Sequence, residues 1–180
     1  MENFWINRLF FTILPPQPVQ AFVSDLKKQV RKAIGHGFQD EFSPAHISLF
    51  KYTDFKTESY LYDADWLVSA LLPFEIQVKG LGTFKHGTNK TIYLQIEYKT
   101  PAPDLASVLG GEPVIPHIIL ARNLNPYDFA KAWERLQGLE GNFFRCNTIT
   151  VLKREPNQWS RFLKLPVGIT QSHDTPICVH

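Results

Sequence analysis

The sequence predicts an α+β fold built on an internal duplication. Two observations support this prediction. The expected order of elements, β-α-β-α-β-β-β-α-β-β, mixes helices with a hairpin, and the segment SPAHISLFK at residues 43–51 resembles VIPHIILAR at residues 114–122. Each segment contains the pattern His-Ile-x-Leu-x-Lys/Arg and is followed by a helical pattern and then a strand pattern. Two similar halves indicate a pseudo-twofold axis with a cleft along it.

The first half of the chain contains two strand patterns and two helical patterns. Residues 8–14 are rich in Phe, Ile and Thr and are stopped by a Pro-Pro pair, which predicts a strand. A helix is expected from Pro18, because apolar residues recur every three or four positions until two glycines end the pattern. Residues 46–50 predict a short strand, and residues 58–72 predict a helix that ends at Pro73.

The second half predicts mostly strands, with one helix from Pro126 to about Leu136. The expected strands are residues 74–78 with an irregular end at 80–84, then 91–98, 116–122, 146–153 and 161–167. A polar tip makes the first two of these strands a hairpin. We expect one two-lobed domain over residues 1–169 and a flexible tail at residues 170–180.

Composition and charge exclude several classes of protein. A dedicated duplex-binding protein usually has a basic stripe and a higher charge than the net +2 found here, so no duplex DNA is expected. A small phosphorylated substrate or an RNA end needs only a local positive field, so the charge neither requires nor excludes nucleic acid. We interpret the basic cluster at residues 27–32 as a solvated helix face rather than an RNA track. The N-terminal apolar run is too short to span a membrane and lacks the features of a secretory signal. We therefore expect a cytoplasmic monomer without membrane contact.

The duplicated segments contain the residues best suited to chemistry. Side chains two apart in a strand share a face, so His46 and Ser48 point the same way, as do His117 and Ile119. If a pseudo-twofold axis relates the two strands, the two histidines face each other across the cleft. No third residue has the spacing of a zinc ligand, so no metal site is predicted.

Five segments occur in an order that resembles a known family. They are RLFFTILPP, HISLFKY, PFEIQVKGLGTF, HIILAR and FFRCNTITVLKRE. Together they resemble the two-histidine phosphoesterase superfamily, which includes 2'-5' RNA ligases and cyclic phosphodiesterases. The resemblance extends over nearly the whole chain, to about Val167.

This resemblance implies a bilobal fold with two antiparallel-rich sheets around a central cleft and flanking helices. It also implies chemistry without metal or cofactor on 2',3'-cyclic phosphates or 2'-5' linkages, with a nucleotide cyclic phosphate or an RNA end as the binding partner. His46 and His117 would be the acid and the base, since the pKa of histidine near 6.5 suits both roles. Ser48 would bind a phosphate oxygen.

The second motif departs from the family pattern, because Ile119 stands where the family has Thr or Ser. A lost hydrogen bond to a charged group costs about 1.5–3 kcal/mol, or roughly a ten- to hundredfold loss in rate if the bond forms in the transition state. One alternative is therefore a nucleotide- or RNA-end-binding module with weakened or lost catalysis. A third reading is an interaction scaffold with an inert cleft.

Four further residues are candidates for substrate binding. Lys51 and Arg122 each follow a histidine by five positions, so strict alternation places them on the opposite strand face. They reach a phosphate only if the strands bulge or end first. Phe11 and Phe84 are candidates for stacking on a base, with a place in the hydrophobic core as the alternative.

Overall fold

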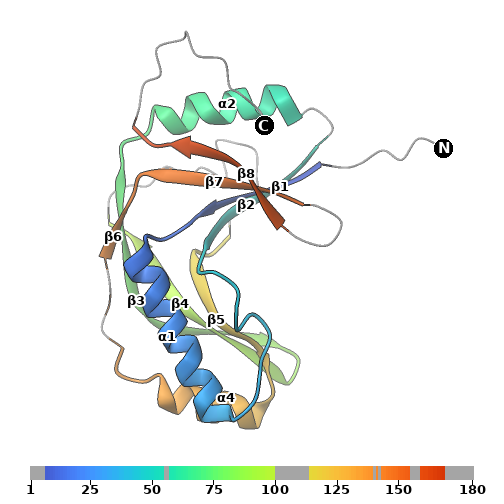
Figure 1. Cartoon of the computed structure of the whole chain (residues 1–180), viewed down its shortest axis with the longest axis vertical. Coiled ribbons are helices and arrows are strands. Elements are labelled where there is room, and N and C mark those ends of the chain that lie inside the picture. The colour runs from blue at the N-terminus through green and yellow to red at the C-terminus, as the bar shows by residue number, and fades with distance from the viewer. Residues whose placement is uncertain are drawn as a thin grey trace, which may run out of the picture.

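Two antiparallel sheets, one in each lobe, form the framework of the protein (Figure 1). The computed structural model describes residues 7–54, 57–99, 114–139, 141, 143–154 and 159–168. Within these residues each sheet has four strands. The fold class predicted from the sequence, α+β with two antiparallel sheets and flanking helices, is confirmed.

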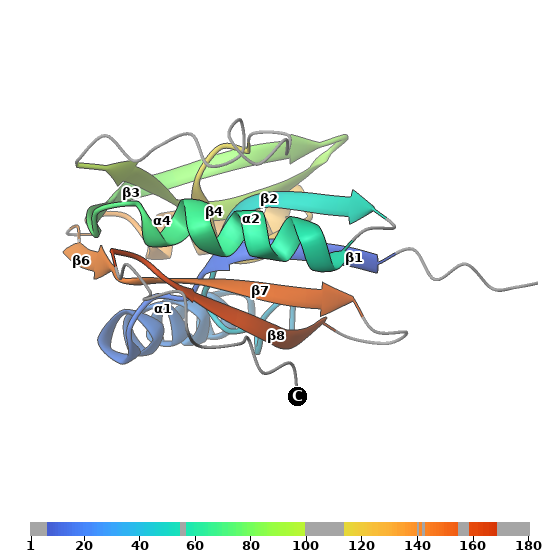
Figure 2. The same ribbon diagram turned by 90° about the horizontal axis from the view of Figure 1, so that it is seen from above.

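The first lobe combines strands from both ends of the chain. Its sheet has the order β2-β1-β7-β8, and one face is covered by helix α2. The bounds of these elements are β1 Asn7–Ile13, β2 Ile47–Asp54, α2 Thr57–Ser69, β7 Thr148–Arg154 and β8 Trp159–Pro166. Figure 2 shows α2 running along these strands. Alternate residues of β1 (Leu9, Phe11 and Ile13) are buried in the core, which leaves the other face of the sheet to the cleft.

The second lobe contains the middle of the chain and, among the described residues, the two helices α1 and α4. Its sheet has the order β5-β4-β3-β6. The bounds are α1 Gln17–Ile34, β3 Phe74–His86, β4 Asn89–Tyr98, β5 His117–Leu124, α4 Pro126–Arg135 and β6 Phe143–Cys146. The apolar stripe of α1 is buried, and α1 packs against α4. Because α1 belongs to this lobe while β2 belongs to the other, the loop between them crosses from one lobe to the other.

The structure corrects two details of the predicted strands. The expected strand at 146–153 corresponds to β7, but its first residue, Cys146, ends β6 instead, and β6 pairs with β3 in the second sheet while β7 pairs with β1 in the first. The chain changes sheets at Asn147, and the buried apolar positions shift there from Phe144 and Cys146 to Ile149 and Val151. The sequence prediction of one alternating strand missed this shift of phase. Residues 74–86 form one strand with a bulge near Gly80, where the sequence predicted an irregular end.

Other segments agree with the prediction or lie outside the described residues. Helix α4 begins at Pro126, and the side chain of Asn125 accepts hydrogen bonds from the backbone N–H groups of Tyr127 and Asp128. The expected tail at 170–180 lies outside the described residues, as does the connector at 100–113. No helix in the described part of the chain is long and apolar enough to cross a membrane.

Candidate active site

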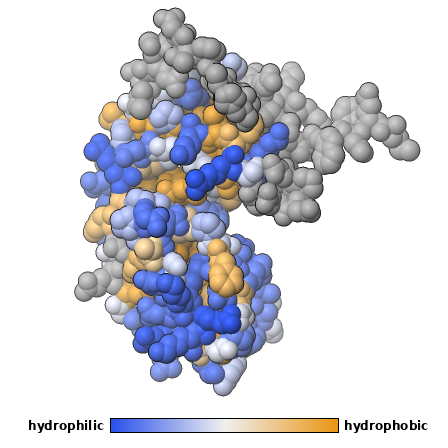
Figure 3. Space-filling model, in the orientation of Figure 1, coloured by the Kyte–Doolittle hydropathy of each residue, from blue (hydrophilic) through white to orange (hydrophobic). Residues whose placement is uncertain are grey.

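A cavity of about 620 Å³ lies between the two lobes. In the space-filling view the surface is indented between the upper and the lower part of the molecule (Figure 3). Strands β2 and β5 are edge strands of their sheets and contact each other across the lobes. The histidines and basic side chains that line the cavity are His46, His117, Lys27, Lys51, Arg122 and Arg161. The fold thus brings both duplicated motifs to one cavity, as the sequence predicted.

The two histidines are held in the same way. Nδ1 of His46 is 3.1 Å from the carbonyl oxygen of Pro44, and Nδ1 of His117 is 2.6 Å from that of Ile115. A carbonyl oxygen only accepts hydrogen bonds, so each Nδ1 carries its hydrogen. Each Nε2 is then left to accept a proton, or to donate one when the ring is charged.

A β-bulge follows each histidine at the same position. On β2, Ser48 pairs with Thr12 and Phe50 pairs with Phe11, so Leu49 is the extra residue. On β5, Ile119 pairs with Tyr93 and Ala121 pairs with Ile92, so Leu120 is the extra residue. Leu49 and Leu120 both stand three residues after a histidine. One extra residue reverses the alternation of side chains along a strand.

These bulges decide where Lys51 and Arg122 point. Strict alternation would place both on the face opposite the histidines, but the alternative in which the strands bulge first is the one that the structure shows. Beyond each bulge the faces are exchanged, and both side chains line the cavity. Bulges are common next to active sites because they redirect a side chain in this way.

The two residues that follow the histidines by two positions also line the cavity. Ser48 lies near His46 and offers a hydroxyl, while Ile119 lies near His117 and offers only a hydrocarbon surface. The second half of the cavity therefore lacks the hydroxyl that the first half has. The sequence indicated this difference, and the structure places both side chains on the same cavity.

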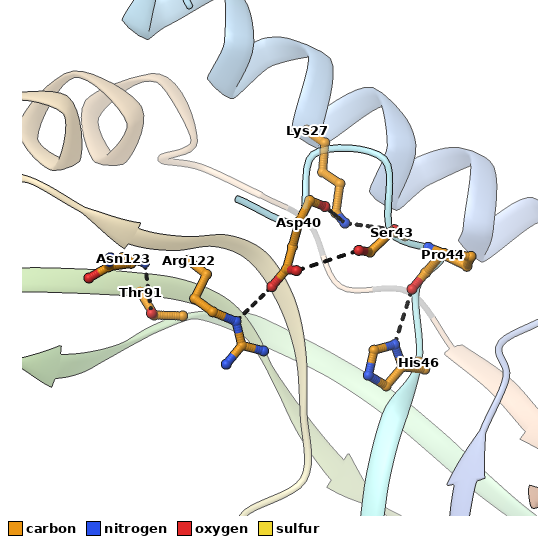
Figure 4. Close-up of polar contacts among 8 residues, drawn as sticks. All are labelled: Lys27, Asp40, Ser43, Pro44, His46, Thr91, Arg122 and Asn123. Atoms are coloured by element: carbon orange, nitrogen blue, oxygen red, sulfur yellow. Dashed lines mark hydrogen bonds and ion pairs between the residues drawn. The ribbon is translucent and has the colours of Figure 1, made fainter. Parts of the chain in front are cut away.

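Arg122 is fixed by the loop that leads into the first motif. Its Nε donates to Oδ2 of Asp40 at 2.6 Å, and a β-bridge joins Gln39 to Arg122. Figure 4 shows the two Nη groups of Arg122 extending away from Asp40. Lys51 is placed differently, with its Nζ 5.8 Å from the centroid of the Phe10 ring.

Two side chains of α1 hold the same loop, and sequence reasoning missed both. The amide of Gln20 donates to the carbonyl of Ala45 at 2.7 Å and accepts from its N–H at 2.8 Å. Nζ of Lys27 donates to the carbonyls of Asp40 and Ser43 at 2.6 and 2.7 Å (Figure 4). Lys27 is only 4% exposed, so the interpretation of residues 27–32 as a solvated face is wrong for this residue.

A signal for these two residues was present in the sequence. Gln20 and Lys27 are seven positions apart, which places them on one side of the helix, next to the apolar stripe that begins at Val19. A polar pair beside a buried stripe is a candidate for holding a neighbouring loop. The partner atoms are backbone carbonyls of another segment, which no sequence pattern identifies.

His46 has a lowered pKa. The main cause is burial, which penalises the charged ring, and the positive charges of Lys27 and His117 act in the same direction. The carbonyl of Pro44 and the charge of Asp40 oppose the shift. Burial also lowers the pKa of Lys27, against the charge of Asp40. The neutral form of His46 is therefore favoured at neutral pH.

Aromatic rings surround His117. Its ring makes edge contacts with Phe84, at 5.0 Å between centroids, and with Tyr93, at 5.4 Å. Phe84 and Tyr93 stack on each other at 4.2 Å. Tyr93 lies over Gly82 on the paired strand, where a Cβ atom would overlap its ring. Phe84 thus contacts a candidate catalytic residue and is not among the residues that line the cavity.

The structure excludes base stacking for Phe11. Its side chain is 0% exposed and stacks on Phe50 in the core of the first lobe, with 4.4 Å between ring centroids. The core alternative therefore holds. The neighbouring residue Phe10 faces the cavity instead, because successive side chains of a strand point to opposite faces.

Comparison with known proteins identifies the family of this chain. The sequence model of the 2'-5' RNA ligase superfamily matches residues 15–158. The chain belongs to this superfamily. The resemblance drawn from the five sequence segments is thereby confirmed, and membership of the superfamily supports phosphoesterase or ligase-like chemistry in general. No curated protein sequence matches this superfamily member.

Several solved structures share the fold of this superfamily member. TT0787 of Thermus thermophilus has a TM-score of 0.64 at 18% identity, over 91% of this chain and 100% of that chain. E. coli LigT complexed with ATP has a TM-score of 0.52 at 16% identity, over 92% and 99%. Kluyveromyces marxianus Usb1 with uridine monophosphate has a TM-score of 0.51 at 16% identity, over 90% and 98%. At such identities the likeness establishes the fold alone.

Proposed function

We propose that this protein is a phosphoesterase that acts, without a metal ion, on a 2',3'-cyclic phosphate or a 2'-5' linked nucleotide at an RNA end. His46 and His117 are the acid and the base. The observation that carries the proposal is the matched pair of rings on one cavity, each with Nδ1 bonded to the carbonyl two residues before it. Superfamily membership adds support.

The proposed reaction needs one proton acceptor and one proton donor. Nε2 of one histidine takes a proton from water as the water oxygen attacks phosphorus. The bond from phosphorus to the ribose oxygen breaks, and Nε2 of the other histidine protonates the leaving oxygen. The two rings exchange protonation states, and solvent restores them.

Phosphate binding in this proposal depends on three side chains. Ser48 donates its hydroxyl to a non-bridging oxygen from the side of the first motif. Arg122 and Lys51, directed into the cavity by the bulges, supply positive charge. Charge-assisted hydrogen bonds from a guanidinium are stronger than neutral ones, so Arg122 is suited to offset the missing hydroxyl at Ile119. A nucleotide or RNA end is the expected partner, and LigT and Usb1 structures with nucleotides are consistent with it.

The proposal is tested by hydrolysis of 2',3'-cyclic nucleotides with a chelator present. We expect turnover by the wild type and a loss of roughly 10²–10⁴-fold in both His46→Ala and His117→Ala. An unchanged rate in either variant would contradict the acid–base pair. The position of the phosphate in the product, 2' or 3', identifies the leaving oxygen.

A second candidate function is a nucleotide-binding module with weak catalysis. The observation that favours it is the apolar Ile119 surface beside His117 in the cavity. The Ile119→Thr variant separates the two functions. A gain of ten- to hundredfold in kcat/KM, the worth of about one hydrogen bond to a charged group, would indicate a binding module with degenerate catalysis. A gain below about threefold would indicate that Arg122 already offsets the loss.

A further inference from the structure

A row of four side chains crosses the cleft face of the first sheet, one from each strand. Phe10 on β1 pairs with Lys51 on β2 and with Leu152 on β7, and Leu152 pairs with Arg161 on β8. All four line the cavity. The row is therefore apolar in the middle and positively charged at both ends.

Arg161 owes its position to another irregularity of pairing. Val151 pairs with Leu163 and Leu152 pairs with Arg161, so one extra residue of β8 lies between the two pairs. Arg161 is exposed and takes part in no ion pair within the described part of the chain. Among the described residues that line the cavity the one carboxylate is Asp40, which is already paired with Arg122. A cation left without a carboxylate in a cavity attracts an anionic ligand.

The two charged ends of the row stand on the two edge strands of the sheet, β2 and β8. Neighbouring strands are about 4.8 Å apart, so three steps separate the backbones at Lys51 and Arg161 by roughly 14 Å. Side chains stand nearly perpendicular to a sheet. Lys51 lies on the histidine strand β2, beside the reacting phosphate of the proposed reaction, whereas Arg161 lies on the far edge strand.

We propose that the cavity binds a nucleotide ligand with a second phosphate, one nucleoside away from the reacting phosphate, and that Arg161 binds this second phosphate. The inference rests on the proposed function, because that function places the first phosphate at the histidines. The nucleoside between the two phosphates lies against the apolar part of the row, Phe10 and Leu152. The second phosphate is either an internucleotide phosphodiester of an RNA end or a 5'-phosphate on a single nucleotide.

Binding of stable product-like ligands tests the inference independently of turnover. The probes are uridine 3'-monophosphate, uridine 3',5'-bisphosphate, and the dinucleotide UpU with a 3'-phosphate, titrated by calorimetry. We expect the second and third probes to bind more tightly than the first. Arg161→Met should weaken binding of those two probes by roughly three- to tenfold and leave binding of the first probe unchanged. For the two weakened probes, the slope of log Kd against log salt concentration should fall by about one.

Two matched variants complete the design. Arg161→Lys keeps the charge and should retain most of the preference. Lys164→Met removes a charge from the same strand at a position that pairs with Thr150 and does not line the cavity, so it should change nothing. A stronger effect on UpU 3'-phosphate than on the bisphosphate identifies the phosphodiester as the ligand, and the reverse identifies the 5'-phosphate.

The inference is overturned if Arg161→Met weakens all three probes equally, since Arg161 would then bind the reacting phosphate. It is also overturned if the variant changes none of them, or if no probe binds. Arg161-dependent binding without any hydrolysis of cyclic phosphates would instead contradict the proposed catalysis and leave the second-phosphate site in place.

Discussion

The segment from His46 to Lys51 and the segment from His117 to Arg122 have the same backbone design and different supports. In both, Nδ1 of the histidine is bonded two residues back, and a bulge three residues on turns a basic side chain into the cavity. The first motif adds the hydroxyl of Ser48, whereas the second has Ile119.

The supports of the two motifs also differ. Two side chains of α1, Gln20 and Lys27, hold the loop before His46 through its backbone. His117 is surrounded by aromatic rings instead. Arg122 is fixed by an ion pair, while Lys51 contacts the ring of Phe10 at 5.8 Å and has no ion pair among the described residues. Both motifs therefore share the backbone features that direct the side chains into the cavity. Arg122, the basic residue that is held more firmly, belongs to the motif that lacks a hydroxyl.

The largest expected difference between the motifs is in their basic residues. Arg122→Met should lower kcat/KM for a 2',3'-cyclic nucleotide by roughly ten- to a hundredfold, because the second motif has no hydroxyl to share the phosphate. Lys51→Met should cost less, roughly tenfold or below, because Ser48 remains beside it. Asp40→Asn combined with Arg122→Met controls for the carboxylate left unpaired. Equal losses of kcat/KM in Arg122→Met and Lys51→Met would contradict the expected difference between the two motifs.

A substitution at Gly82 should disturb the second motif alone. Gly82→Ala places a Cβ into the ring of Tyr93, which contacts His117. Overpacking of this kind costs about 1–3 kcal/mol, and we expect a lower melting temperature together with a lower kcat. Thr83→Ala, at the next and exposed position, is the matched control. A variant with normal kcat and a lower melting temperature would show that the rings stabilise the fold without positioning His117.

A substitution at Lys27 should disturb the loop before His46. Lys27→Met leaves the carbonyls of Asp40 and Ser43 without their donor, and one unsatisfied buried group costs about 1–3 kcal/mol. Urea unfolding measures this as a lower midpoint at an unchanged slope. The control is Lys28→Met, whose exposed pair with Asp25 is worth little. Equal midpoints for the two variants would contradict the structural role of Lys27.

The smallest effect concerns the titration of His46. Its pKa should lie below the ordinary 6.5 because burial disfavours the charged ring, and Asp40→Asn should lower it further by removing a charge that raises it. Ring resonances followed by NMR against pH measure both shifts. Because the unfolded chain binds the proton more readily, this residue's contribution to stability is lost as pH falls below about 6.5. A titration at or above 6.5 would mean that water reaches the ring.

Much of the candidate site could be predicted from the sequence, and the rest depended on contacts between distant segments. The repeat of His-Ile-x-Leu identified both histidines, Ser48 and the deviation at Ile119. The direction of Lys51 and Arg122 could not be predicted, because a bulge depends on the register with the partner strand. The sheet change at Asn147 was missed although the apolar alternation shifts phase there, from Phe144 and Cys146 to Ile149 and Val151, because the shift does not show which sheet each strand joins.

By itself the sequence determined the fold class, most of the elements and the two motifs, because these follow from local periodicity and from the repeated segment. Only the tertiary structure decided which side chains reach the cavity. In the structure Lys27 is buried against backbone carbonyls. Phe11 lies in the core while Phe10 lines the cavity, and Arg161 lines the cavity at the far end of the row. Each of these outcomes depends on pairing between segments that are distant in the sequence, and a local pattern contains no information about its partner.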